Sequence, residues 1–572
     1  MVALGAFLTL AAPAQAAGDP IMPLSEVRSG MRCTGLSVVR GTDISSFDIE
    51  VIDVVAGQQG TADPRILVRA SGPAIDATGL GPGFSGSPIY CPDDNGVSRS
   101  IGAVSEAIGE YGGKVVLATP IEAIIGETPE PPPSARRDPA MLRSARPLAA
   151  PLTVTGLHPA LARRLTDAGR RAGRTVIATP PGPLGTFPPQ ELRPGSAVSV
   201  GTANGDVAIG AIGTVAYTDG PTVWAFGHPF EGTGPRSLLL QDAYVYTVVN
   251  NPFGVDPAFT YKLASPGHDL GTIANDAAAA VVGRTGALPR TIPLQITAED
   301  VDSGRTRTVD LYAADEAPLG LPSGASGLTL AAPLALAQVG TQALRGIPSR
   351  MTAAMCVRIS LEERERPIRF CNRYVSGGAP GGDAGGLGAL TTDLSNATSF
   401  LDAYNFGPLN VTRVEVNVDL RRGLRQGYMV RARMPRRVRR GSRVPVTLTI
   451  RRVNGPEQRV RFRIRVPRSL PTGLVEMELR GTAAELFTDE LIIDFDELLT
   501  LEEEDGPDPG DPGPRTVEEL AREIEGLRRY DGVNARFSRA GRERVIAELP
   551  QAYRDRDIRI SGRTSLRFRV VG

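Results

Sequence analysis

The sequence predicts a mainly β protein of several domains, and three observations lead to this prediction. The chain has 572 residues, more than one hydrophobic core usually supports, so we expect roughly two to four domains. It contains 65 glycines and 48 prolines, well above average usage, which indicates many turns between short strands. Apolar and polar residues alternate strictly in several segments, which is the pattern of half-buried antiparallel strands.

The first 17 residues have the pattern of a secretory signal peptide. An apolar run ends in Ala14-Gln15-Ala16, an A-x-A cleavage pattern, although no charged segment precedes the run. The alternative is a frayed apolar N-terminus. Beyond this run no apolar stretch is long enough to span a membrane. We therefore expect the chain to be exported, either secreted or associated with the cell envelope.

Residues 18–126 have the pattern of short strands between glycine turns, such as 35–39 and 101–104, which predicts a barrel or sandwich. A short helix should follow, with Thr119 as N-cap, Pro120 at the first helical position and Glu122 completing a capping box. The proline-rich stretch 127–151 predicts a crossover linker.

Residues 152–350 should form a second strand-rich half that begins with a short helical segment. Residues 351–410 should form a connecting hairpin and a helix. In residues 411–481 the period-two alternation is clearest, with four or five strands in about 70 residues, which predicts a small β-sandwich. An acidic linker, 482–515, and a small C-terminal α+β segment, 516–572, should complete the chain.

Arginine fills the outward positions of the expected sandwich. Residues 411–470 hold 18 arginines against 3 acids, and residues 471–515 hold 14 acids against 2 arginines. We interpret the arginines as a solvated face that pairs within the chain. The alternative is a polyanion-binding surface, which would show strong salt dependence. Over the whole chain 63 basic residues balance 63 acidic ones, so no nucleic-acid partner is expected.

One glycine-rich turn, GPGFSGSPIY at 81–90, has the composition that a nucleophilic serine needs. Glycines let the backbone bend so that the Ser85 hydroxyl projects and a substrate can approach. They also leave amides free, and the amides of the nucleophile and of the residue two before it hold the oxyanion in serine peptidases. Here these are Ser85 and Gly83. The alternative is an ordinary glycine-rich β-turn.

A nucleophilic serine needs a general base, and the chain has three histidines. His158 precedes an expected helix, and His268 is expected in a turn. His228 follows an apolar strand that carries the only tryptophan, Trp224, at the expected rim of a barrel. His228 is therefore the candidate base, with a purely structural strand-end histidine as the alternative. So few histidines and no Cys/His cluster argue against a metal site, and no cofactor is expected.

Several segments resemble the SpoIVB peptidase family, serine endopeptidases typified by the sporulation stage IV protein B protease. They include 22–27 (MPLSEV), 47–51 (FDIEV), 83–89 (GFSGSPI) and 226–228 (FGH). The resemblance covers about 22–125 and 195–290. It implies Ser85 as nucleophile and His228 as general base. The two blocks occur here in the opposite order and without a PDZ-like segment, so the chain resembles a permuted, extended relative.

The catalytic acid of the SpoIVB family has no counterpart at the matching position of this chain. The family places it 15 residues before the serine, where this chain has Ala70. Asp76, Asp242 and Asp269 are possible substitutes. Loss of the acid lowers catalysis in serine peptidases by roughly 10⁴-fold without abolishing it, so a Ser/His dyad or a relocated acid remains open.

Taken together, these observations and the resemblance imply an exported serine endopeptidase that acts on a protein or peptide substrate. Its fold would be mainly β, a chymotrypsin-like double β-barrel followed by an immunoglobulin-like β-sandwich and the small C-terminal segment. The alternative function is a non-catalytic envelope or interaction protein that retains the peptidase fold.

The four cysteines should form two disulfides, which suits an oxidising compartment. Cys33 and Cys91 belong to the same predicted barrel, and Cys356 and Cys371 flank a predicted hairpin. We therefore expect the pairs 33–91 and 356–371, with four buried free thiols as the alternative.

Overall fold

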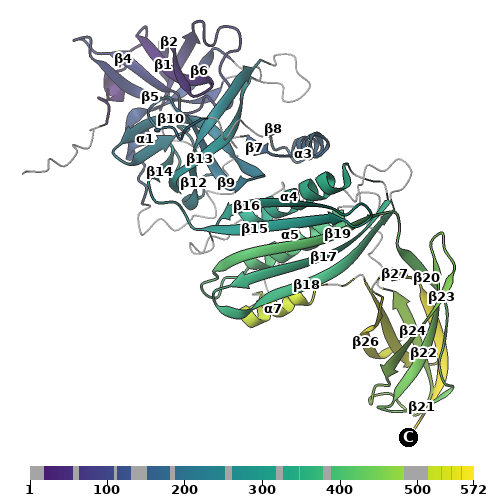
Figure 1. The fold of residues 1–572 in the computed structure, drawn as a ribbon. Helices are drawn as coiled ribbons and strands as arrows, with labels where there is room; N and C mark the ends of the chain where they lie inside the picture. Colours follow the sequence, from purple (N-terminus) through teal and green to yellow (C-terminus); the bar gives the residue numbers. More distant parts are fainter. Residues whose placement is uncertain are drawn as a thin grey trace, which may run out of the picture. The chain divides into compact units, whose positions relative to one another are not determined.

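A computed structural model gives the fold of the chain (Figure 1). It describes residues 18–55, 64–107, 113–130, 151–180, 187–250, 260–316, 326–346, 348, 350–377, 388–481, 513–527, 529, 531–542, 544–555 and 557–572. The predicted signal peptide and most of the two predicted linkers lie outside these residues. The chain forms two compact units, the first from 1–156, 174–202 and 208–290 and the second from 157–173, 203–207 and 291–572.

The first unit begins with a closed six-stranded barrel, which confirms a barrel as one of the two arrangements predicted for this segment. Its strands follow the order β1-β2-β3-β6-β5-β4, and all neighbours are antiparallel. The bounds are β1 Arg32–Arg40, β2 Asp43–Val55, β3 Arg65–Ser71, β4 Pro88–Pro92, β5 Ser98–Ala107 and β6 Val115–Pro120. Alternate residues such as Phe47, Ile49 and Val51 fill its core, as period-two alternation requires.

Two details in and next to this barrel can be compared with the predictions made from the sequence. The disulfide Cys33–Cys91 joins β1 to β4, as predicted. The helix α1, Ile121–Gly126, begins one residue later than expected, with Pro120 at the N-cap, and the predicted capping box is wrong. The Thr119 hydroxyl donates to the Gly227 carbonyl at 2.7 Å, and the Glu122 carboxylate accepts from a distant amide at 2.8 Å. Tertiary contacts have replaced the local cap because both side chains face other segments of the unit.

A second, curled array of strands follows in the first unit. Its strands are β7 Leu152–Thr155, β8 Val176–Thr179, β9 Ala197–Gly205, β10 Ala208–Asp219, β11 Thr222–Ala225, β12 Gly234–Val249, β13 Tyr261–Asp276 and β14 Val281–Thr285. Neighbours run in the order β9-β12-β13-β14-β11-β10, and a further pairing between β9 and β10 connects the two ends of this run. The strands β7 and β8 extend the array from β10.

His268 lies within β13, so its predicted turn is wrong. The register between β12 and β13 shifts between Gln241 and Ala243, which face Asp269 and Pro266. The Pro-Gly pair that indicates a turn in the sequence is therefore absorbed into a β-bulge, where an extra residue needs no partner.

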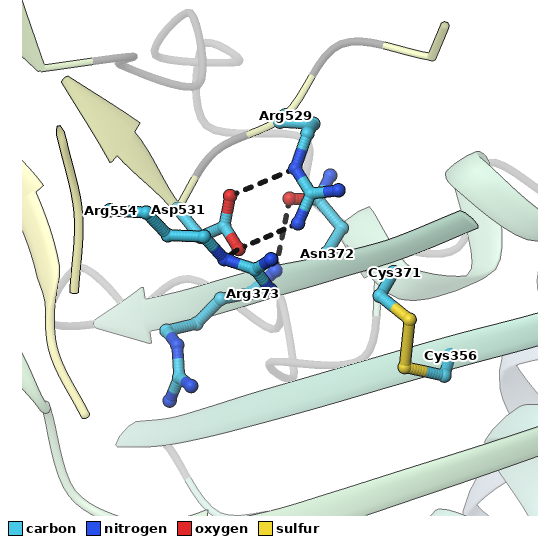
Figure 2. Close-up of a disulfide and its surroundings, with 7 residues drawn as sticks. All are labelled: Cys356, Cys371, Asn372, Arg373, Arg529, Asp531 and Arg554. Atoms are coloured by element: carbon cyan, nitrogen blue, oxygen red, sulfur yellow. Dashed lines mark hydrogen bonds and ion pairs between the residues drawn. A yellow bond between two sulfur atoms is a disulfide. The ribbon is translucent and has the colours of Figure 1, made fainter. Parts of the chain in front are cut away.

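The second unit contains a sheet in the order β18-β17-β19-β15-β16. Its elements are α3 Pro159–Arg171, β15 Thr291–Asp300, β16 Arg305–Ala314, α4 Gly327–Leu344, β17 Arg350–Leu361, β18 Arg364–Gly377, α5 Gly388–Asp402 and β19 Val411–Arg422. The predicted disulfide Cys356–Cys371 bridges the hairpin of β17 and β18. Figure 2 shows it beside Asp531, which Arg529 and Arg554 bind through ion pairs. No helix among the described residues is long and apolar enough to cross a membrane.

Two further sheets of this unit share one apolar core. One has four strands in the order β23-β22-β20-β27, and the other has five in the order β21-β28-β24-β25-β26. The bounds are β20 Gln426–Arg433, β21 Arg437–Arg439, β22 Arg443–Arg452, β23 Glu457–Arg465, β24 Gly473–Gly481, α7 Val517–Glu525, β25 Gly532–Arg539, β26 Val545–Arg554, β27 Arg559–Ser561 and β28 Arg563–Val571.

This two-sheet body differs at both ends from the range 411–481 expected from the sequence. The strand β19 pairs with β15 and β17 instead, and the strands after residue 531 complete the core. Phe537 and Phe568, from that C-terminal part, pack edge to face with ring centroids 6.4 Å apart. Alternation identifies a half-buried strand but carries no information about which distant strand covers it.

Candidate active site at the glycine-rich turn

The turn that carries Ser85 lies between β3 and β4 and can be built only with glycine at two positions. Gly83 and Gly86 have φ of +93° and +91°, which other residues adopt only under strain. A Cβ atom on Gly86 would lie 1.9 Å from the carbonyl oxygen of Thr214. The glycines of the motif therefore set both the bend of this turn and its close approach to β10.

Two carbonyl groups of the turn are fixed by hydrogen bonds, one from a residue of β13 and one from the serine that ends the turn. The Lys262 amide donates to the Pro82 carbonyl at 3.0 Å, and the Ser87 hydroxyl donates to the Phe84 carbonyl at 2.6 Å. In a trans peptide the N–H of the next residue points away from the carbonyl. These two bonds therefore orient the two amides that the sequence predicts as an oxyanion hole.

Those amides, of Gly83 and Ser85, donate no hydrogen bond to any residue that the structure describes. The alternate amides, of Phe84 and Gly86, do donate, to backbone carbonyls at 3.0 and 2.7 Å. Backbone amides in a tightly packed turn are almost always paired. Two oriented donors without a partner, on the nucleophile and two residues before it, have the pattern of an anion-binding pair.

The side chains of the motif distinguish the two serines. Ser87 is fully buried, and its hydroxyl is engaged with the Phe84 carbonyl and, at 3.0 Å, with Ser37 Oγ. Ser85 is partly exposed, and its hydroxyl makes no hydrogen bond with any described residue. Ser85 is therefore the serine that a substrate can reach.

The predicted base follows an unusual stretch of backbone. Phe226 is fully buried at φ +70°, and Gly227 follows at φ +68°. A bulky residue in the left-handed region is a genuine outlier that the surrounding structure must maintain, and such strain concentrates at functional sites. The Thr119 hydroxyl holds the Gly227 carbonyl at 2.7 Å. The His228 side chain is therefore placed by a strained, anchored segment.

One residue of β10 links the serine turn to the histidine segment. The Thr214 amide donates to the Ser85 carbonyl at 2.8 Å, and the Thr214 carbonyl accepts from the Phe226 amide at 3.2 Å. The two predicted site segments are thus two hydrogen bonds apart through Thr214. The Ser85 hydroxyl and the His228 ring form no direct hydrogen bond in the described part of the chain; in ligand-free enzymes such hydrogen bonds are often long.

The His228 ring has a defined tautomer. Its Nδ1 lies 2.7 Å from the Pro229 carbonyl oxygen, which only accepts, so Nδ1 carries the proton and Nε2 keeps its lone pair. Burial lowers the pKa of His228, while the Pro229 carbonyl and the charge of Glu106 oppose this shift and Arg65 adds to it. The ring is therefore neutral near pH 7, the form that a general base needs.

None of the acids proposed from the sequence is hydrogen-bonded to this ring. Asp76 pairs with Lys114 at 2.7 Å, and Asp242 pairs with Nδ1 of His268 at 3.0 Å. Asp269 accepts a hydrogen bond from a glutamine amide at 2.8 Å. In the described part of the chain, a backbone carbonyl occupies the position on Nδ1 that an acid has in a complete triad.

Two charged residues near the predicted base, Arg65 and Glu106, were not predicted from the sequence. Arg65 at the start of β3 and Glu106 near the end of β5 form an ion pair at 3.2 Å. Both charges act on the pKa of His228. Each lies on a strand with no motif around it, so only the closure of the barrel brings them to this site.

A buried lysine was also missed. Lys262 is 2% exposed, and its Nζ donates to Ser37 Oγ at 2.7 Å and to Thr214 Oγ1 at 3.0 Å. It also lies 4.6 Å from the centre of the Phe84 ring, and no described carboxylate forms an ion pair with it. Burial lowers the pKa of Lys262 to about 7. The only signal in the sequence is rarity, since the chain has two lysines, Lys114 and Lys262.

No family model, curated protein or solved structure matches this chain. Among the described residues no three His, Cys, Asp or Glu side chains are grouped as a metal ion would require.

Proposed function

We propose that the chain is an exported serine endopeptidase in which Ser85 attacks the peptide carbonyl and His228 accepts its proton. The observation that carries the proposal is the pair of oriented, unengaged amides on Gly83 and Ser85. The partly exposed Ser85 hydroxyl and the resemblance of this turn to the SpoIVB peptidases support it further. The two disulfides are typical of exported proteins.

In this mechanism the substrate carbonyl lies against the serine turn. Attack by Ser85 Oγ moves negative charge onto the substrate oxygen, and the Gly83 and Ser85 amides donate to it. Because their peptide groups are already fixed, the amides need no reorganisation when the charge develops. Loss of one such donor typically costs about 10²–10³-fold in kcat.

Proton transfer would use Nε2 of His228, the nitrogen that the Pro229 carbonyl leaves unprotonated. The proton taken from Ser85 would then pass to the leaving amine. A carbonyl stabilises the imidazolium less than a carboxylate does, so we expect slow turnover, on the scale of the roughly 10⁴-fold loss that follows loss of the acid in serine peptidases.

We also propose that the barrel β1–β6 and the curled array β9–β14 together form a chymotrypsin-like double barrel. The β9–β10 pairing, which connects the ends of the second array, supports this assignment. For the two-sheet body of the second unit we propose an immunoglobulin-like sandwich.

The test is hydrolysis of a fluorogenic peptide library by the mature chain and two variants. Ser85→Ala should lose activity, and Ser71→Ala, which removes an exposed hydroxyl from β3 of the same barrel, should retain it. Equal cleavage by wild type and Ser85→Ala would exclude Ser85 as nucleophile. No cleavage by any correctly folded form would favour the alternative, a non-catalytic envelope or interaction protein, which Ala70 at the position of the family's acid supports.

A further inference from the structure

The outer face of the four-stranded sheet in the second unit is strongly cationic. Exposed arginines alternate along β23 at 459, 461, 463 and 465, while Val460 and Ile464 between them are buried. The strands β20, β22 and β23 together hold nine arginines and one acid, Glu457. The basic residues lie on the solvent side because the apolar residues between them are needed in the core.

The strand register places these charges in rows on the two strands that flank β22. Arg431 of β20 faces Thr449 of β22, which faces Arg459 of β23. The next row outward runs from Arg433 through Thr447 to Arg461. Arginines therefore flank each central threonine, in rows repeating about every 7 Å along strands about 4.8 Å apart. The result is a two-dimensional grid of positive charge, which we call the arginine face.

The arginine face lacks the acids that balance charge elsewhere in the same body. Its one ion pair among the described residues joins Arg451 to Glu457 at 2.8 Å. On the five-stranded sheet Arg567 pairs with Glu476 at 3.1 Å, and Arg480, Arg536 and Arg554 also pair with acids. From the sequence we expected the arginines of 411–470 to form ion pairs within the chain. The acids Glu476 and Glu478 pair instead with arginines of their own sheet.

An exposed aromatic residue lies at the border of the arginine face. Tyr428 of β20 faces Arg451 of β22 and is 51% exposed. Two residues further on, Val430 is 43% exposed. A tyrosine beside cations is suited to a membrane interface, where its ring enters the headgroup layer and its hydroxyl stays hydrated.

We propose that the arginine face binds the surface of an anionic lipid bilayer. The charges lie in rows on both sides of β22 rather than as a track along one strand, which fits a planar layer of headgroups better than a single extended polymer. Basic side chains near an anionic bilayer contribute about 1 kcal/mol each. Tyr428 and Val430 supply the apolar contact. This proposal is independent of the peptidase site.

Co-sedimentation with lipid vesicles tests the proposal. The full chain is mixed with phosphatidylcholine vesicles that contain 30% phosphatidylglycerol, since about a third anionic lipid is enough for a negative surface potential. We expect binding to these vesicles, none to pure phosphatidylcholine, and loss of binding as salt rises. The triple variant Arg459→Gln, Arg461→Gln, Arg463→Gln should bind roughly 100-fold more weakly. The matched control, Arg480→Gln, Arg536→Gln, Arg567→Gln, removes the same charge from the other sheet and should bind nearly as wild type.

Three outcomes would overturn the proposal. One is absence of binding to anionic vesicles at low salt, and another is an equal loss of binding in the two triple variants. The third concerns the source of the negative charge. Tyr428→Ser should weaken vesicle binding while leaving heparin and single-stranded DNA binding unchanged. Tight binding to those soluble polyanions, with vesicle binding insensitive to Tyr428→Ser, would assign the arginine face to a polymer instead.

Discussion

The Lys262 ammonium group lies 3.0 Å from the Thr214 hydroxyl, and that hydroxyl donates to the Gly83 carbonyl at 2.9 Å. A buried cation that pairs with no carboxylate among the described residues thus contacts the residue that links the serine turn to the histidine segment. Burying a charge is costly unless it is well paired. A cost of this kind next to a candidate active site indicates that the lysine serves the site more than it serves stability.

This cost should appear as a pH dependence of stability. Burial lowers the pKa of Lys262 from 10.5 to about 7, so between these values the unfolded chain binds one more proton than the folded chain. The free energy of unfolding should therefore rise with pH across this window, by about 1.4 kcal/mol per pH unit. Lys262→Met removes the contribution. Urea unfolding of both proteins at pH 7.5 and 9.0 should show a wild-type gain about 2 kcal/mol larger; equal gains would contradict the assignment.

Activity should persist below the usual histidine range. Burial lowers the pKa of His228, and only the neutral ring accepts a proton. The acid limb of kcat/KM should therefore have its midpoint below about pH 6.5, the ordinary value for histidine. The same midpoint in Lys262→Met would assign the limb to the histidine. A midpoint near 7 that moves in this variant would assign it to the lysine.

Ser85 and His228 should act as one unit. Ser85→Ala should lower kcat by roughly 10⁴-fold or more, and His228→Ala by at least about 100-fold. The double variant should be no slower than Ser85→Ala alone, because the base has no function without the nucleophile. His158→Ala, at the exposed N-cap of α3, is the control and should keep full kcat. Multiplicative losses in the double variant would show that the two residues act separately.

Gly86→Ala should destabilise the first unit far more than Gly96→Ala, although both glycines have a positive φ. Gly96 has φ +78° and an added Cβ would meet no atom within 4 Å, so Gly96→Ala should cost only about 1–2 kcal/mol. At Gly86 the Cβ would meet the Thr214 carbonyl oxygen at 1.9 Å, which adds about 1–3 kcal/mol or more. Thermal unfolding of both variants measures the difference; similar losses would mean that the turn does not approach β10 this closely.

Local patterns in the sequence were sufficient for part of this structure. Alternation placed the strands, and cysteine spacing on a barrel and on a hairpin gave both disulfide pairs. The alternation and the pair 356–371 are local, because the side-chain period and the hairpin geometry need only neighbouring residues. The pair 33–91 spans 58 residues and followed from the expectation that both cysteines lie in one barrel.

Features that depend on distant contacts were missed. The strand β19 joined another sheet, Thr119 bonded to Gly227 rather than capping a helix, and Glu106 lies near His228 through barrel closure. The motif at 81–90 made Ser85 the candidate nucleophile, but one of the two bonds that orient its amide pair comes from the Lys262 amide, which follows the motif by more than 170 residues. No pattern within the turn specifies that partner.

The most direct test of the central claim is covalent labelling of the purified protein with a fluorophosphonate probe. This reagent reacts with a serine only where a base and an oxyanion hole activate it. We expect a single modified peptide, mapped by mass spectrometry to Ser85, absent from Ser85→Ala and strongly reduced in His228→Ala. An unlabelled wild-type chain with both disulfides intact, or a label on any other serine, would contradict the account.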